Sequence, residues 1–291
     1  DPTFAFAPQS EVLGGYDIAR DIVFKKNDAG YWRGILENSS KDLAPELRVL
    51  AVKMLHKNGA ISSKELLDIA KKSPYHNVRM EAFVTNREIA DENFTEALKV
   101  ALEDSYEIVR RIAMGTAPKN GNPELIPYVA KAIVDPAVSK REDMQADFAM
   151  PDFDAQLMIA AIDSLRKEHA GWFTDAKFED ICEDIRYDAE RKSKEYADML
   201  AGNYSESKKI FYIEIERNKC SVDALGVLYD MIANGPEKEK VVAAEILGWY
   251  VYSYRKPEIL AKGKEFYANA SEEAVKNELL KTINRLECKR S

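Results

Sequence analysis

The chain has 291 residues, of which 46% are hydrophobic, and its 50 acidic and 42 basic residues give a formal net charge of −8 at pH 7. This acidic balance disfavours non-specific binding to a phosphate backbone, so no nucleic-acid partner is expected. No run of about 18 apolar residues is present, so no membrane span is expected. The three cysteines form no C-x-x-C motif, and we expect neither a metal site nor a cofactor.

Residues 1–40 are predicted to form an N-terminal arm and capping helices. Pro2 and Pro8 interrupt regular backbone hydrogen bonding and predict an extended arm. Gly14-Gly15 precedes a predicted helix at 16–25. Because the chain starts at Asp1 rather than Met, the compartment stays open: cytoplasmic, or extracytoplasmic if a signal segment preceded Asp1.

Helix follows helix in the next hundred residues or so. Asn58-Gly59 ends the first of these helices, Ser62 or Ser63 starts the second, and Ser73-Pro74 ends it. Further helices are predicted at 76–90 and 93–102, and at 105–115 and 123–134. The apolar positions of the first helix fall on one face: Leu43, Leu47, Leu50, Ala51, Met54 and Leu55.

A short pattern returns in this region at a fixed interval. Leu47-Arg48-x-x-Ala51 reappears as Val78-Arg79-x-x-Ala82 and as Val109-Arg110-x-x-Ala113, each time 31 residues later. A period of this size is typical of a solenoid, in which each helical pair stacks on its neighbours. The sequence therefore predicts an all-α fold, a right-handed α-α superhelix of about six to seven helical pairs.

The period breaks after the third unit. The next comparable helix core, Leu157-x-x-x-Ala161, comes 48 residues after Val109, and Pro136 and Pro151 flank the excess. We predict three regular repeats at 41–136, an insertion at 137–153, and divergent helical repeats with a C-terminal cap at 154–291. The later helices are predicted at 154–168, 174–200 (one helix or two), 205–217, 222–233, 236–254, 257–267 and 271–287.

The Val-Arg-x-x-Ala helix, followed by a turn and a second amphipathic helix, resembles HEAT repeats, most closely the short units of the bilin-lyase type. The resemblance covers 41–136 and is clearest in 104–135, DSYEIVRRIAMGTAPKNGNPELIPYVAKAIVD. It implies an armadillo-type fold whose concave face is lined by the second helix of each pair. It also implies a structural ladder in which recurring arginines pair with aspartates of adjacent units: Arg48, Arg79 and Arg110 with Asp68, Asp104 and Asp135.

No local catalytic or metal-binding signature stands out. The histidines His56, His76 and His169 lack metal-ligand spacing, and glycine-rich phosphate loops are missing. Asp180, Asp184 and Asp188 share one helix face and would suit a divalent cation. The i,i+4 spacing of Asp188 and Lys192 favours a solvated helix face instead, with no metal.

Aromatic residues gather near the predicted helix 236–254. Tyr and Trp suit surfaces that are apolar at one end and wet at the other. Core packing is the favoured explanation of such a cluster, and an exposed binding surface stays open as the alternative. The candidate binding surface consists of Trp249, Tyr250, Tyr252 and Tyr254.

The repeat architecture favours a non-enzymatic protein- or ligand-binding or scaffolding module that uses its concave face, with a protein or peptide as partner. Two alternatives remain open. One is an enzyme of lyase type on a HEAT-like scaffold, and the other is a helical-repeat accessory domain of a larger extracytoplasmic protein. The sequence identifies neither the ligand nor the oligomeric state.

Overall fold

The computed structural model describes residues 24–40, 43–133, 159, 162–163, 166–174 and 176–287. The secondary structure of these residues is helical, with no strand among them, as the sequence predicts. The chain divides into two compact units, one ending at Asn93 and one starting at Phe94. This boundary falls inside the predicted block 41–136. The predicted arm at the N-terminus and the insertion 137–153 lie outside the described residues.

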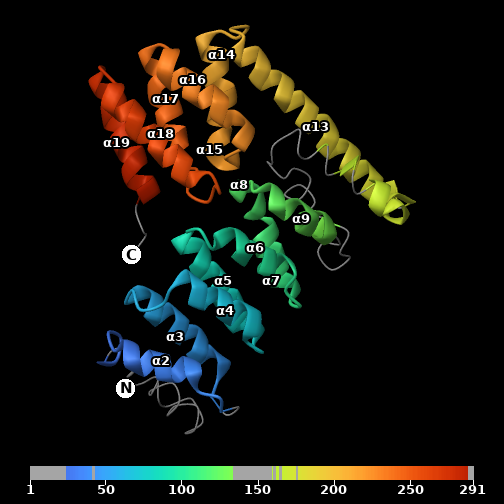
Figure 1. Cartoon of the computed structure of the whole chain (residues 1–291), viewed down its shortest axis with the longest axis vertical. Coiled ribbons are helices and arrows are strands. Elements are labelled where there is room, and N and C mark those ends of the chain that lie inside the picture. Colours follow the sequence, from blue (N-terminus) through green and yellow to red (C-terminus); the bar gives the residue numbers. More distant parts are fainter. Residues whose placement is uncertain are drawn as a thin grey trace, which may run out of the picture. The chain divides into compact units, whose positions relative to one another are not determined.

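The first unit contains α2 (Ala29–Glu37), α3 (Pro45–Lys57), α4 (Ser63–Lys72) and α5 (His76–Ile89) in its described part. In Figure 1 these are the blue to teal helices, and α2 packs on α3, α3 on α5 and α4 on α5. The Ser62 hydroxyl accepts a hydrogen bond from the Glu65 amide and Glu65 accepts one from the Ser62 amide, a capping box. The largest core side chains are Trp32, Leu55, Leu66 and Phe83.

A cluster of buried hydrophobic side chains forms a core in the C-terminal half of the second unit. There α16, α17 and α19 pack in sequence, and α18 packs on α19 (Figure 1). Core side chains include Met199, Ile213, Leu228 and Leu279. The described helices are α6 (Phe94–Leu102), α7 (Glu107–Met114), α8 (Ala117–Asn120), α9 (Ile126–Ile133), α13 (Ala176–Leu200), α14 (Glu206–Glu214), α15 (Glu216–Lys219), α16 (Leu225–Asn234), α17 (Glu237–Leu247), α18 (Lys256–Asn269) and α19 (Glu273–Glu287), with 3₁₀ turns at Pro123–Leu125, Ala170–Thr174 and Val222–Ala224.

Two helices of the second unit bear on the predicted boundaries, one by deciding between alternatives and one by correcting a prediction. The predicted segment 174–200 is one long helix, α13. The predicted helix 236–254 is too long, because α17 ends at Leu247 and turns fill the chain before α18. An ideal Cβ on Gly248 would lie 2.6 Å from Nη1 of Arg285, so α19 approaches the backbone closely where α17 ends.

The 31-residue period is a property of the backbone as well as of the sequence. Gly59, Ala90 and Gly121 follow one another at this interval, and all have positive φ, at 63°, 46° and 68°. Tyr75 and Tyr106 are also 31 residues apart and cap their helices with nearly the same dihedrals, φ −94° ψ 117° and φ −97° ψ 118°. The same local structure therefore recurs with the motif.

A similar helical unit returns late in the chain. The short helix α8 ends in left-handed Gly121 and leads through a 3₁₀ turn into α9. The short helix α15 ends in left-handed Cys220, φ 55°, and leads through a 3₁₀ turn into α16. This resemblance lies in backbone geometry, since the Val-Arg-x-x-Ala motif is missing there.

Candidate functional site

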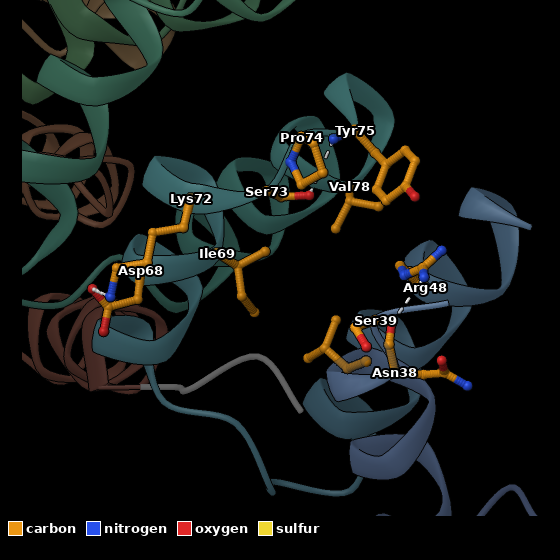
Figure 2. A pocket seen from close by; sticks show the side chains of 11 residues that line it. Asn38, Ser39, Arg48, Asp68, Ile69, Lys72, Ser73, Pro74, Tyr75 and Val78 are labelled. Atoms are coloured by element: carbon orange, nitrogen blue, oxygen red, sulfur yellow. Dashed lines mark hydrogen bonds and ion pairs between the residues drawn. The ribbon is translucent and has the colours of Figure 1, made fainter. Parts of the chain in front are cut away.

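A pocket of about 500 Å³ opens in the first unit, a volume within the usual range of small-molecule sites. It is formed by the end of α2 and the segment that follows it, by α3, and by the junction of α4 and α5 (Figure 2). Its lining residues are Leu36, Asn38, Ser39, Arg48, Asp68, Ile69, Lys72, Ser73, Pro74, Tyr75 and Val78.

Arg48 is the buried cation of this pocket, with only 5% of the residue exposed. Its Nη1 donates to the carbonyl of Leu43 at 2.6 Å, and its Nη2 donates to the carbonyls of Asn38 at 2.8 Å and Ser40 at 2.7 Å. The guanidinium carbon lies 4.8 Å from the centre of the Tyr75 ring. Figure 2 shows Arg48 between Tyr75 and the Asn38–Ser39 segment. These contacts fix the guanidinium before any ligand arrives.

The positive charge of Arg48 has no carboxylate partner among the described residues. The contacts that hold it are carbonyl oxygens and an aromatic face. Asp68, the acid of the pocket, pairs instead with Lys72 on its own helix, at 3.3 Å. The three carbonyl bonds use three of the five guanidinium donors, which leaves two.

Other polar groups of the pocket are unpaired within the described part of the chain. These are the Tyr75 hydroxyl, the Ser39 hydroxyl and the side-chain NH₂ of Asn38, whose oxygen accepts a hydrogen bond from the Ser40 amide at 2.8 Å. The remaining wall is apolar and comes from Leu36, Ile69, Pro74 and Val78. A mostly apolar cavity with a few polar groups is the usual form of a ligand site.

The recurring arginines all bind backbone carbonyls just ahead of their own helices. Each is the fourth residue of its helix. Arg79 donates to the carbonyl of Ser73 at 3.0 Å and Arg110 donates to that of Asp104 at 2.6 Å, as Arg48 does to Leu43. Helical side chains point toward the helix N-terminus, so an arginine at this position reaches the preceding turn.

The proposed aspartate ladder needs correction at Arg48. Arg48 and Asp68 do not pair, because Asp68 binds Lys72 and Arg48 binds carbonyls. The backbone carbonyl of Asp104 accepts a hydrogen bond from Arg110, and its carboxylate accepts one from the Tyr106 amide at 2.7 Å. Asp135 lies outside the described residues. Before α3, α5 and α7 the same contact recurs, in which an arginine donates to a backbone carbonyl just ahead of its own helix, and we call it the arginine lock.

Ion pairs between successive helical pairs do occur, but with glutamate, which the sequence reasoning missed. Most place the basic residue first and the glutamate 25 to 32 residues later, although Lys131 and Glu103 have the reverse order. An acid one period after a base is a signal that a search at the repeat spacing could have found. The pairs are Arg33–Glu65 and Lys53–Glu81 in the first unit, and Lys99–Glu124, Lys209–Glu239, Arg217–Glu245 and Lys240–Glu272 in the second. The ring nitrogen Nε2 of His56 lies 3.3 Å from Glu88 at the same spacing.

The four aromatic residues of the candidate binding surface have different environments. Tyr250 is fully buried and donates its hydroxyl hydrogen to the carbonyl of Ser221 at 2.8 Å, so its assignment to a surface is wrong. The Tyr252 ring lies 6.1 Å from that of Phe94, and its carbonyl accepts from Asn120. Trp249 and Tyr254 are 37% and 39% exposed. Of the four proposed surface residues, Trp249 and Tyr254 are therefore the exposed ones.

Trp249 is held in place by its neighbours. Its ring nitrogen donates to Glu245 at 2.7 Å, and the Arg285 guanidinium lies over the ring at 4.5 Å. The pKa of Glu245 is lowered, because hydrogen bonds from Arg217 and Trp249 and nearby positive charge outweigh its burial.

The acidic run of α13 forms ion pairs. Arg166 binds Glu179 at 2.5 Å and Glu183 at 2.8 Å, and Arg191 binds Asp188 at 3.2 Å. Within the described residues, no group of three or more His, Cys, Asp or Glu is placed to hold a metal ion. No helix among them is both long and apolar enough to cross a membrane.

Comparison with protein families, curated proteins and solved structures found no match. The pocket around Arg48 is therefore assigned from its own geometry.

Proposed function

We propose that this chain is a non-enzymatic binding module built from HEAT-like helical repeats, and that it takes its ligand in the pocket around Arg48. One observation carries the proposal: a guanidinium that is fixed by three carbonyls, and has no carboxylate partner among the described residues, lines a cavity of about 500 Å³. Ligand sites are usually preformed cavities of this size with few polar groups.

The repeat part of the proposal has separate support. Left-handed residues at an interval of 31, and arginine locks at the same interval, are what stacked copies of one supersecondary unit require. A solenoid of such units presents an extended surface to a partner. We propose that a protein or peptide is the natural partner and that the pocket receives one part of it.

A fragment screen tests the proposed function. The full chain, labelled with ¹⁵N, is titrated with a set of small fragments, and amide shifts of Asn38, Ile69 and Tyr75 report on the pocket. Ile69→Trp fills the pocket with a larger side chain. Ile108→Trp is the matched control, because Ile108 is exposed on α7 and does not line the pocket.

We expect fragments that shift the three pocket amides in the wild type and in I108W but not in I69W. A screen in which no fragment shifts them would contradict the proposed site. Chemical conversion of a bound fragment, at a rate that I69W abolishes, would contradict the non-enzymatic part.

A further inference from the structure

We infer that the pocket around Arg48 selects ligands with a carboxylate head on an apolar body, an inference that rests on the binding function proposed above. It names the ligand class, which the repeat architecture leaves open. The argument uses the charge balance of the pocket, its unpaired donors and its apolar wall.

The charge balance of the pocket favours an anion. Asp68 and Lys72 neutralise each other at 3.3 Å, so the formal charge that remains is that of Arg48. Carbonyl dipoles stabilise a guanidinium but do not cancel its charge, and a buried charge is normally compensated by an opposite one. The net charge of −8 on the whole chain opposes this only weakly, because exposed charges beyond about 10 Å are screened at 0.1 M salt.

The unpaired hydrogen-bonding groups of the pocket favour a ligand that accepts hydrogen bonds. Two guanidinium donors of Arg48, the Tyr75 hydroxyl, the Ser39 hydroxyl and the Asn38 NH₂ can all donate, and none has a partner within the described residues. A carboxylate accepts hydrogen bonds only and offers about four lone-pair sites. An ammonium only donates, so it leaves these groups unpaired and adds repulsion with Arg48.

The rest of the pocket wall favours a ligand whose remaining part is apolar. Leu36, Ile69, Pro74 and Val78 line the same cavity, and an alkyl or aliphatic side chain would remove their surface from water. Two sources share this chemistry: a free aliphatic acid, and the C-terminus of a peptide that ends in an apolar residue. The backbone amide of the peptide distinguishes them.

Ligands matched in all but the head group provide the test. The ¹⁵N-labelled full chain is titrated with octanoate, octanol and octylamine, and with N-acetyl-leucine and N-acetyl-leucinamide, at constant ionic strength. We expect octanoate to bind about tenfold to a hundredfold more tightly than octanol, since a hydrogen bond to a charged group contributes that much. Octylamine binds most weakly, and N-acetyl-leucine binds better than its amide.

Comparison between the two acids identifies the source. Tighter binding of octanoate supports a free aliphatic acid, and tighter binding of N-acetyl-leucine supports a peptide terminus. Arg48→Met is expected to remove the preference of octanoate over octanol. If R48M does not fold, the comparison of ligands on the wild type still decides, and Tyr75→Phe, which keeps the stacked ring, is expected to weaken octanoate binding severalfold.

Octanol or octylamine binding as tightly as octanoate, with shifts at the pocket amides, would overturn the carboxylate preference and leave the proposed binding function standing. No shift with any of the five compounds would also overturn the preference. The fragment screen with I69W and I108W then decides the binding function separately.

Discussion

Ala90 and Gly121 hold the same left-handed conformation 31 residues apart, with φ of 46° and 68°. In each case the amide of this residue donates to a carbonyl four residues back and ends a helix. Only glycine adopts this conformation without a steric cost, which is about 1–2 kcal/mol for other residues. Ala90 is therefore strained where Gly121 is not.

Replacing Ala90 by Gly is expected to increase the free energy of unfolding by about 0.5–1 kcal/mol, because relief of strain exceeds the added entropy of the unfolded chain. Gly59→Ala is expected to decrease it by about 1 kcal/mol, since its Cβ enters open space. Gly121→Ala is expected to cost more, because its Cβ would lie 2.9 Å from Val222 Cγ1. Urea unfolding measures all three, and a destabilised A90G would contradict the account.

The sequence indicates only some of the left-handed positions that recur every 31 residues. Gly59 and Gly121 mark helix ends by residue type, and the helix end predicted at Asn58-Gly59 is confirmed. Ala90 gives no such signal, because alanine favours helix interiors. The position follows only once the 31-residue period is applied to the backbone. Local signals therefore predict helix boundaries well when a capping residue carries them.

Tertiary contacts explain what the sequence could not predict. The recurrence of Arg48 was visible, but its acceptors are backbone carbonyls, which no residue type marks. Trp249 and Tyr250 look alike in the sequence, yet one is exposed and the other buried, since α17 ends two residues before Trp249. The pocket itself depends on how α2, α3 and α4 pack, which periodicity does not specify.

Arg48→Met is expected to lower the free energy of unfolding by about 2–4 kcal/mol, because three carbonyls lose a charged donor. Arg87→Met is the control, since Arg87 makes no hydrogen bond or ion pair within the described residues. It is expected to change stability by less than about 0.5 kcal/mol. Equal effects in guanidinium unfolding would contradict the arginine lock.

Glu216 is a buried carboxylate in the second unit, 3% exposed. It accepts hydrogen bonds from the Tyr196 hydroxyl at 2.7 Å and from the Ser221 amide at 3.0 Å. Glu216→Ala removes both acceptor oxygens from the Tyr196 hydroxyl and the Ser221 amide, and is expected to cost about 2–4 kcal/mol. Exposed Glu214 is the control, and E214A is expected to be nearly neutral. Thermal unfolding of both variants checks the difference.

Glu272 makes stability depend on pH in acid. Hydrogen bonds from Lys240, at 2.7 Å, and from Ser271 lower its pKa from the ordinary value of 4.5 to about 2. Its contribution to stability is therefore complete above pH 4.5 and is lost as the pH falls toward 2.

Glu272→Gln is expected to flatten the loss of stability between these pH values relative to the wild type. Glu237→Gln, at an exposed residue of α17, is expected to leave the pH profile unchanged. Urea midpoints measured at several pH values check this. The same acid-induced loss in E272Q as in the wild type would show that the Lys240–Glu272 pair does not cause it.

A crystal structure of the full chain grown with octanoate tests the central claim most directly. The account predicts the carboxylate within hydrogen-bond distance of the Arg48 guanidinium, with the alkyl chain against Leu36 and Ile69. Octanoate bound only at other places, with the pocket empty, would contradict the account. An alkyl chain in the pocket with its carboxylate turned away from Arg48 into solvent would also contradict it.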